Sequence, residues 1–161
     1  MGRIESLPLH SESIDVAWLS TVIHQFDDRD TAAGELHRVI RPGGRVLVRG
    51  FLSDVTITGL FSMFPGIERS ADSFPSTDSV VSSFESAGFT LDRVTDVVEP
   101  WEFDLVAWTE RVRSVRHIDS GLRPLTDTEF DKGLQVVTEA FSATNGPIAS
   151  DGTLRLVVLR K

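Results

Sequence analysis

The sequence has 161 residues, of which 40% are hydrophobic and 25% are charged, and its formal net charge is −8. These proportions are ordinary for a globular chain, and the length suits one domain with a buried core. The acidic balance argues against a general nucleic-acid binder, which would carry a basic stripe. The lack of cysteine excludes disulfides, thiolate nucleophiles and cysteine metal sites.

The sequence also lacks the features of a membrane-spanning or metal-binding protein. No apolar run approaches the ~18 residues that a membrane span needs, and the first residues lack the basic and apolar blocks of a signal peptide. The sequence therefore predicts a cytoplasmic protein with neither membrane nor nucleic-acid partners. His10 and His117 have no acidic or histidine neighbours at ligand spacing, so no metal site is predicted.

Residues 13–51 carry the clearest structural pattern. Ile14–Leu19 is a short apolar run, typical of a strand buried on both faces. From about Asp30 the apolar residues recur at steps of three and four, which predicts a helix that must end before Pro42. The two glycines after this proline allow a turn without Cβ clashes, and Arg45–Phe51 is a second apolar strand. Strand, helix and strand make one βαβ unit with parallel strands.

The next segment has no clean period. Residues 59–66 are rich in glycine and phenylalanine, and Pro65-Gly66 breaks any helix there. This composition predicts either a satellite core cluster or a mobile lid. Ser76 or Thr77 can then cap a helix that stops at Gly88, where a left-handed C-cap residue belongs.

The C-terminal part adds two strands and two helices. Phe89–Val98 is predicted to be a strand, and residues 101–146 to hold two helices. Thr126 and Glu129 form a capping box at the start of the second helix, which Asn145-Gly146-Pro147 ends. Asp151-Gly152 indicates a turn before the last strand, Leu154–Leu159.

Several stretches together carry a family resemblance. They are Glu5-Ser6-Leu7-Pro8-Leu9, Ser13-Ile14-Asp15-Val16, His24, Asp28, Glu35-Leu36-His37-Arg38-Val39-Ile40-Arg41-Pro42-Gly43-Gly44 and Phe84-Glu85-Ser86-Ala87-Gly88-Phe89. They resemble the class I S-adenosylmethionine-dependent methyltransferases, in the methyltransferase type 11 pattern. The main match covers about a third of the chain, and its Arg-Pro-Gly-Gly piece is quite specific in this setting.

The resemblance implies an α/β fold with a partial Rossmann-like methyltransferase sheet, comprising family strands four to seven with their helices. In that family the strand order is three, two, one, four, five, seven, six, and the last strand is antiparallel in a mixed, otherwise parallel sheet. The four strands predicted above take positions four to seven in chain order. Residues 1–161 then form a single partial methyltransferase-like domain with a two-helix insertion at about 101–146.

The sequence also departs from the family pattern. Family members open with a Gly-x-Gly-x-Gly loop after strand one and an acidic residue after strand two, and neither precedes Ile14. Gly43-Gly44 is no substitute, because it leads into a strand, whereas a cofactor loop leads out of a strand into a helix. We therefore expect a truncated chain, the C-terminal half of such an enzyme, that is inactive alone and binds S-adenosylmethionine weakly or not at all.

The resemblance nevertheless implies cofactor contacts. It places the loop with Arg3 and Ile4 against adenine, where Arg3 replaces a common aspartate and the Ile4 N–H can still serve. An unstructured N-terminal tail is the alternative. Ser20 and Thr21 follow the first strand at the carboxyl edge of a parallel sheet, where ligands of open α/β folds bind. The family's methionine moiety lies there, although two hydroxyls also suit a simple turn cap.

His24 is the candidate catalytic residue, because near neutrality it can deprotonate a hydroxyl or amine acceptor. The alternative is a surface histidine without chemistry. Phe51, Phe61, Phe64 and Trp101 can wall an apolar pocket for a small-molecule acceptor, with core packing as the alternative for each.

The predicted function is methyl transfer from S-adenosylmethionine to a small molecule, resting mainly on proximity and orientation. The alternative is a catalytically inactive methyltransferase-like remnant that acts as an association module. The strand Ile14–Leu19 lacks its family neighbour and carries no lysine or proline, so its open edge predicts a homodimer. The competing outcome is that residues 2–9 or the helices of 101–145 cover this edge.

Overall fold

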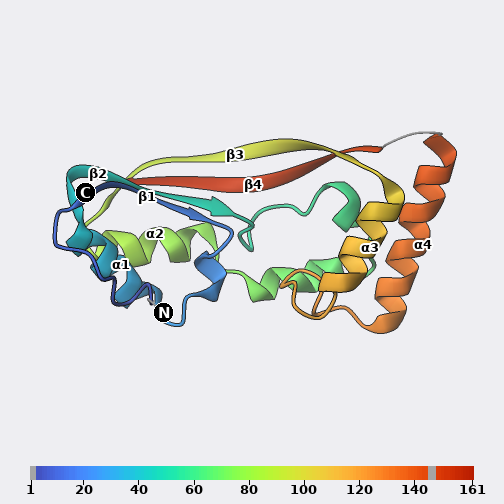
Figure 1. Cartoon of the computed structure of the whole chain (residues 1–161), viewed down its shortest axis with the longest axis horizontal. Coiled ribbons are helices and arrows are strands. Elements are labelled where there is room, and N and C mark those ends of the chain that lie inside the picture. Colours follow the sequence, from blue (N-terminus) through green and yellow to red (C-terminus); the bar gives the residue numbers. More distant parts are fainter. Residues whose placement is uncertain (1–2, 145–147) are drawn as a thin grey trace. The chain divides into compact units, whose positions relative to one another are not determined.

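The computed structural model describes residues 3–144 and 148–161, and for residues 101–103, 144 and 148–151 it describes the backbone only. The chain falls into two compact units. Unit 1 comprises Met1–Asp54, Pro75–Val97 and Leu154–Lys161, and unit 2 comprises Val55–Phe74 and Val98–Thr153. Figure 1 labels the helices and strands along the chain. The two helices predicted at 101–146 lie in unit 2, together with the segment rich in glycine and phenylalanine.

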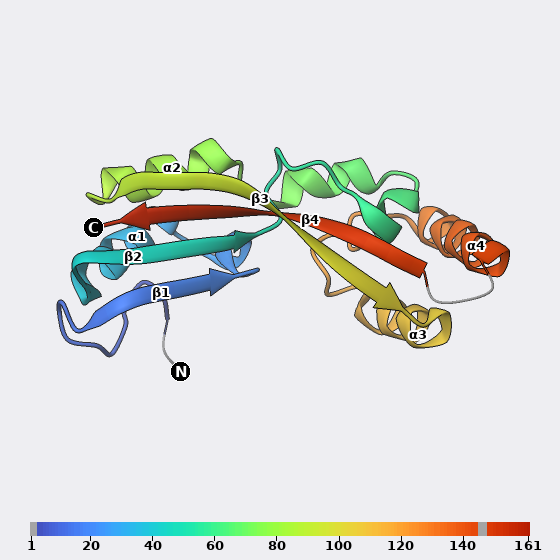
Figure 2. The ribbon, with the colours of Figure 1, turned by 90° about the horizontal axis from the view of Figure 1, so that it is seen from above.

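The strands form one sheet in the order β1-β2-β4-β3 (Figure 2). Their bounds are Ile14–Ser20 for β1, Ile40–Gly50 for β2, Thr90–Phe103 for β3 and Ile148–Arg160 for β4. β1 and β2 are parallel, while β2 and β4 are antiparallel. This is the predicted order four, five, seven, six, and the antiparallel last strand is confirmed.

The helix α1, Arg29–Val39, connects β1 to β2. The Asp28 carboxylate caps it by accepting a hydrogen bond of 3.0 Å from the Thr31 N–H. The helix stops before Pro42, as predicted, and β2 starts at once. Gly44 is needed here, because a Cβ would lie 2.7 Å from the carbonyl oxygen of Asp15. The glycine therefore lets β2 pass close to β1.

The helix α2, Thr77–Ser86, begins at the predicted cap, where Ser76 Oγ accepts from the Ser79 N–H at 3.2 Å. Gly88 follows it with φ +101°, as a left-handed C-cap residue. α1 and α2 cover the same face of the sheet (Figures 1 and 2). The buried side chains of unit 1 include Leu19, Ile23, Leu36, Val39, Val46, Val48, Val80, Phe84, Phe89, Val157 and Leu159.

The opposite face of the sheet carries no helix in the described part of unit 1 (Figure 2). Val16 and Trp18 of β1 are each 55% exposed, whereas Leu19 on the helix-covered face is 8% exposed. The sequence predicted cover on both faces of this strand. One face is open because α1 and α2 both lie on the other.

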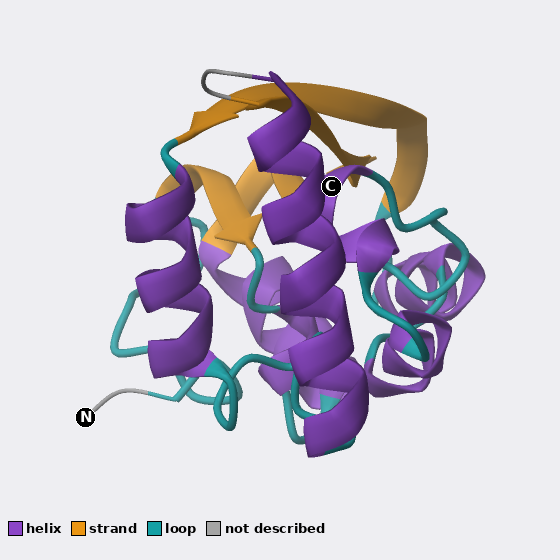
Figure 3. Ribbon diagram, turned by 90° about the vertical axis from the view of Figure 1, so that its right-hand side faces the viewer, coloured by secondary structure: helices purple, strands orange, loops and turns teal. Residues whose placement is uncertain are grey.

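In unit 2, α3 spans Leu105–Val115 and α4 spans Asp127–Thr144, with the 3₁₀ helices η2, Gly59–Met63, and η3, Ile67–Ser73. α3 and α4 lie side by side (Figures 1 and 3). The predicted capping box is present: the Thr126 N–H donates to Glu129 Oε2 at 2.8 Å, and the Glu129 N–H donates to Thr126 Oγ1 at 3.3 Å.

Of the two alternatives for residues 59–66, the packing is that of a satellite core cluster. The segment buries Leu60 and Phe64 against α3 and α4. The buried members of this cluster are Leu60, Phe64, Ile67, Trp108, Val112, Leu122, Leu125, Phe130, Leu134, Val137 and Phe141.

A buried arginine holds the loop between α3 and α4. Arg116 is 6% exposed, and its Nη1 donates to the Leu122 carbonyl oxygen at 2.8 Å while Nη2 donates to that of Leu125. Its guanidinium carbon lies 4.9 Å from the centre of the Phe130 ring. Arg116 thus fixes the carbonyl groups of Leu122 and Leu125 in this loop.

Three predicted strand boundaries are wrong. β2 starts at Ile40, before the predicted start at Arg45, and runs through Gly43 and Gly44, where a turn was predicted. β3 runs through Pro100 to Phe103, beyond the predicted strand end at Val98, and α3 starts only at Leu105. Because β3 is an edge strand, a proline there need not remove a ladder hydrogen bond. β4 starts at Ile148 and passes through Asp151-Gly152, where a turn was predicted. The predicted stop of α4 at residues 145–147 lies outside the described residues.

Within the described ranges, no helix combines the length and the apolar character that crossing a membrane requires.

Candidate functional site

The carboxyl ends of β1 and β2 bring the predicted polar residues together. Ser20 ends β1, and its Oγ accepts a hydrogen bond of 3.0 Å from Arg49 Nη1 on β2. The Thr21 N–H donates to the Arg49 carbonyl oxygen at 2.7 Å. The two hydroxyls therefore lie at the carboxyl edge of a parallel pair, where ligands of open α/β sheets bind.

Thr21 has an unusual backbone conformation. Its φ is +54°, in the left-handed region that a β-branched residue rarely adopts. Its hydroxyl donates to the Ser20 carbonyl oxygen at 2.8 Å, and its N–H donates to the Arg49 carbonyl oxygen at 2.7 Å. The conformation is therefore held from two sides, which orients the chain that leads to His24. No sequence pattern predicts this left-handed conformation.

Arg3 and Ile4 belong to a defined loop instead of an unstructured tail. The Ser6 N–H donates to the Arg3 carbonyl oxygen at 3.1 Å. The Arg3 guanidinium lies 2.7 Å from the Asp27 carboxylate and 3.3 Å from that of Glu5. These two carboxylates, Asp27 first, raise the pKa of Arg3. The loop thus meets the segment that follows His24, so two predicted parts of the site are neighbours.

The helix α1 anchors this loop through one ion pair. The Glu35 carboxylate accepts from Arg38 at 2.6 and 2.8 Å and from the Leu7 N–H at 2.8 Å. Arg38 also donates to the Leu9 carbonyl oxygen at 3.0 Å. Arg38 first, and then the Leu7 N–H, lower the pKa of Glu35 to about 2. Glu35 and Arg38 therefore act as a clamp for residues 7–9.

This clamp predicts a pH dependence. The folded-state pKa of Glu35 lies below its ordinary value of 4.5. The ionised Glu35 carboxylate therefore stabilises the folded loop fully above pH 4.5, and this stabilisation is lost as the pH falls towards 2. We expect the Leu7 amide to lose protection from hydrogen exchange within this window. Glu35→Gln should loosen the loop already at pH 7 and remove the pH dependence. The matched control is Glu85→Gln on α2, and an unchanged Leu7 amide in Glu35→Gln would contradict the clamp.

His24 lies in the 3₁₀ helix η1, Ile23–Gln25, directly after the Thr21 turn. Its neighbour Ile23 is fully buried and anchors this short helix in unit 1, while His24 itself is half-buried. His24 is thus positioned at the same edge as Ser20 and Thr21, four residues after the strand ends. It remains the predicted general base.

The aromatic residues predicted to form an acceptor pocket are distributed over both units. Phe51 follows β2 in unit 1 and is half-buried. Phe61 and Phe64 belong to the cluster of unit 2, and Phe64, 1% exposed, packs against Trp108 and Phe130. This environment suits core packing, the alternative for Phe64. The side chain of Trp101 lies outside the described residues.

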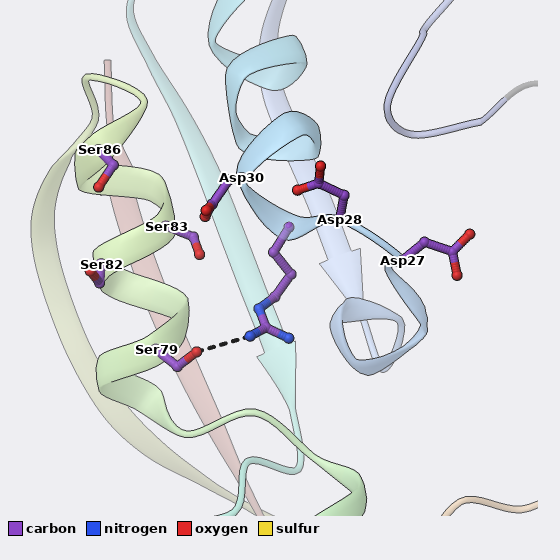
Figure 4. A pocket seen from close by; sticks show the side chains of 8 residues that line it. Asp27, Asp28, Asp30, Ser79, Ser82, Ser83 and Ser86 are labelled. Atoms are coloured by element: carbon purple, nitrogen blue, oxygen red, sulfur yellow. Dashed lines mark hydrogen bonds between the residues drawn. The ribbon is translucent and has the colours of Figure 1, made fainter.

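A polar pocket between α1 and α2 was not predicted (Figure 4). Its volume is about 560 Å³, and α2 contributes four serines at helical spacing. Arg29 Nη2 donates to Ser79 Oγ at 3.0 Å across it. The lining residues are Asp27, Asp28, Arg29, Asp30, Ser79, Ser82, Ser83 and Ser86. The spacing of the serines was the available signal, and none of the predicted site residues lines this pocket.

The described residues hold no group of three histidine, aspartate or glutamate side chains that could bind a metal ion.

Two of the predicted cofactor residues already have side-chain partners. The Arg3 side chain is engaged by two carboxylates, and Ser20 Oγ already accepts from Arg49. Ile4, Ser20 and Thr21 would contact the cofactor from one side only, because the 161 residues contain no Gly-x-Gly-x-Gly segment. Such a loop would supply the close backbone approach on the other side.

The fold is similar to that of solved structures. The chain superposes on the [4+2]-cyclase SpnF with a TM-score of 0.56 at 18% identity, covering 99% of this chain and 55% of that one. It superposes on the YcgJ protein from Bacillus subtilis with a TM-score of 0.56 at 21% identity, covering 99% and 69%. At this identity the likeness shows the fold, a Rossmann-like mixed α/β sheet.

Sequence comparisons find relatives among the methyltransferases. Residues 1–48 match a family model described as a methyltransferase domain. The methyltransferase GfsG of Streptomyces halstedii is 37% identical over 99 residues, which cover 58% of this chain and 34% of that protein. The demethylmenaquinone methyltransferase of Streptomyces avermitilis is 25% identical over 129 residues, covering 76% and 56%. The chain is related to the class I S-adenosylmethionine-dependent methyltransferases, and it spans about a third to a half of these curated relatives.

Proposed function

We propose that this chain takes part in methyl transfer from S-adenosylmethionine to a small-molecule acceptor. The family supports the reaction class. One structural observation supports the site: Arg3 contacts Asp27 at 2.7 Å, so the loop that follows the N-terminus lies against the segment that leaves β1. The predicted cofactor-binding residues and His24 are thereby gathered at one end of the sheet in unit 1.

Each residue would have a separate role. S-adenosylmethionine supplies an electrophilic methyl group when it is bound. The Ile4 N–H can donate to a purine nitrogen, and the hydroxyls of Ser20 and Thr21 can orient a polar tail. His24 can accept the proton that an acceptor hydroxyl or amine loses as it is methylated. Orientation of the acceptor supplies most of the remaining rate enhancement.

The relatives do not define the acceptor. Their names specify demethylmenaquinone, arsenite and malonyl-[acyl-carrier protein] as acceptors, three chemically unlike groups. SpnF is named a cyclase, so a shared fold does not fix the reaction. Phe51 remains the candidate for an apolar acceptor wall in unit 1, because it is partly exposed.

A second function is favoured by one observation. The open face of the sheet exposes the apolar side chains of Val16 and Trp18. A catalytically inactive relative that acts by association would have such a face. The cofactor site and the open face therefore support different functions, and binding experiments can separate them.

Cofactor binding by the 161-residue chain is expected to be weak. We expect titration calorimetry with S-adenosylhomocysteine, the stable product analogue, to give a dissociation constant of about 1 mM or larger, worth about 4 kcal/mol or less. The physical reason is that contacts come from one side of the cofactor only. A dissociation constant near ~1 μM, worth about 8 kcal/mol, would show that the site is complete within this chain.

Nuclear magnetic resonance can locate such weak binding. At millimolar S-adenosylhomocysteine the amide signals of Ile4, Ser20 and Thr21 should shift, and Ser20→Ala should reduce these shifts. Ser82→Ala, in the separate polar pocket, is the matched control. Shifts confined to other residues would overturn the proposed site. No shift anywhere would favour the association module.

A further inference from the structure

We infer that Thr21 is a positioning residue, whose left-handed backbone holds His24 at the carboxyl edge of β1. This role rests on the proposed function, in which His24 accepts the proton that the acceptor loses. It belongs to the backbone conformation of Thr21 and is separate from the cofactor contact proposed for the Thr21 hydroxyl.

Thr21 keeps a backbone conformation that its own side chain disfavours. Its φ is +54°, and the only other non-glycine residue with positive φ in the described part of the chain is Glu12, at +53°. Branching at Cβ makes this region rare for a threonine. Glu12 lies before the amino end of β1, whereas Thr21 follows the carboxyl end, where ligands of open α/β sheets bind. Backbone outliers of this kind cluster at functional sites.

The left-handed residue changes the direction of the chain at the end of β1. In a strand that continued, each residue would add about 3.3 Å, so His24 would lie about 13 Å beyond the present strand end. Thr21 is instead followed by the short helix η1, in which the Gln25 N–H donates to the Val22 carbonyl oxygen at 2.9 Å. The conformation at Thr21 therefore decides whether His24 stays beside the edge of the sheet.

Two anchors fix the short segment that carries His24. The Thr21 N–H donates to the Arg49 carbonyl oxygen at 2.7 Å, which ties the turn to β2. The Ile23 side chain is 0% exposed, which ties η1 to the core of unit 1. His24 itself is half-buried. Its backbone is thus held in place, while its side chain keeps a partly exposed surface that an acceptor could reach.

The Thr21 hydroxyl supports the conformation of its own turn. It donates to the Ser20 carbonyl oxygen at 2.8 Å. Valine has nearly the same shape and the same branching at Cβ but lacks this donor, so it should leave the left-handed region. Glycine adopts this region without a Cβ clash, and asparagine enters it more readily than most residues. Glycine and asparagine at position 21 should therefore keep His24 in place, and valine should not.

A role in side-chain packing would give a different order of variants. If the Thr21 side chain acted by filling space, valine of nearly equal volume would be the mildest replacement and glycine the most disruptive. Thr21 is exposed, so little packing is lost with either residue. A positioning role and a packing role thus predict opposite orders for valine and glycine, and one series of variants separates them.

Nuclear magnetic resonance of the His24 ring tests this order without a ligand. In Thr21→Gly and Thr21→Asn the ring signals should stay at their wild-type positions. In Thr21→Val they should move, and the Gln25 amide should exchange about tenfold faster or more. The amide of Leu19, which pairs with β2, should stay protected in every variant, which separates a local change from unfolding. Thr90→Val is the matched control, because Thr90 is an exposed threonine in the strand β3.

Millimolar S-adenosylhomocysteine connects this role to the proposed function. The wild-type His24 ring signals should shift, Thr21→Val should lose at least half of this shift, and Thr21→Gly should keep more of it than Thr21→Val. Both variants lack the hydroxyl, so their difference reports the backbone. An absent wild-type shift would count against methyl transfer, while the ligand-free series still decides the role of Thr21. Unchanged His24 and Gln25 signals in Thr21→Val, or equal disturbance in Thr21→Gly, would overturn the inference.

Discussion

Replacing Arg116 with methionine is expected to lower the free energy of unfolding of unit 2 by about 3 kcal/mol. Methionine matches the length of the side chain but leaves the carbonyl oxygens of Leu122 and Leu125 without their donor. Each buried acceptor left unsatisfied costs about 1–3 kcal/mol. The free energy gained by burying the apolar methionine side chain is smaller than this cost, so the variant is less stable than the wild type. Arg116→Lys should recover part of the loss, because one ammonium cannot reach both carbonyls with the geometry of a guanidinium.

Urea denaturation followed by far-ultraviolet circular dichroism measures this effect. Arg113→Met is the matched control, since Arg113 lies on the exposed side of α3 and should change stability by less than about 0.5 kcal/mol. If Arg116→Met were as stable as the wild type, the loop carbonyls would have other partners and the assigned role of Arg116 would be wrong.

Replacing two helical glycines with alanine is expected to change the free energy of unfolding in opposite directions. Gly133 in α4 is buried, and a Cβ there would fall on the ring of Phe64, 2.7 Å from Cε1 and closer still to Cδ1. Because that ring is itself buried in the unit 2 cluster, it cannot move aside cheaply. Gly133→Ala should therefore destabilise unit 2 by about 1–3 kcal/mol, even though alanine favours a helix by about 1 kcal/mol.

Gly34 in α1 provides the comparison. It is exposed, and a Cβ there meets no atom within 4 Å. Gly34→Ala should stabilise unit 1 by about 1 kcal/mol through helix propensity alone. Thermal unfolding of both variants tests the pair. A destabilised Gly34→Ala, or a stabilised Gly133→Ala, would contradict the packing described for that helix.

The helix ends were predictable because local chemistry determines them. Pro42 sets the end of α1, Gly88 ends α2, and Thr126 with Glu129 starts α4. The family resemblance supplied the order of the strands, including the antiparallel β4. Strand lengths were not predictable in the same way, because Pro100 breaks a strand only where its missing N–H would be needed. That depends on whether the strand lies at an edge.

The place of Ser20 and Thr21 in the sheet was predictable, and their backbone geometry was not. Ser20 and Thr21 follow an apolar strand, and this pattern places them at the carboxyl edge of the sheet. The left-handed Thr21 and the contact from Arg3 to Asp27 depend on residues far apart in sequence, so no local signal reports them. Arg116 shows the same limit. Its place in the sequence, three residues after the exposed Arg113, gives no sign of its burial, which follows from the return of the loop over it.

The distribution of tryptophans makes the two units optically distinguishable. Trp18 in unit 1 is largely exposed, whereas Trp108 in unit 2 is 4% exposed and lies against Phe61 and Phe64. With Trp101→Phe, one indole remains in each unit. The solvated indole emits at longer wavelength and is accessible to acrylamide, and the buried one is not. Quenching of the red-shifted component therefore reports the edge of β1 and the state of unit 1, while the blue-shifted component reports the core of unit 2, in one sample and without an added label.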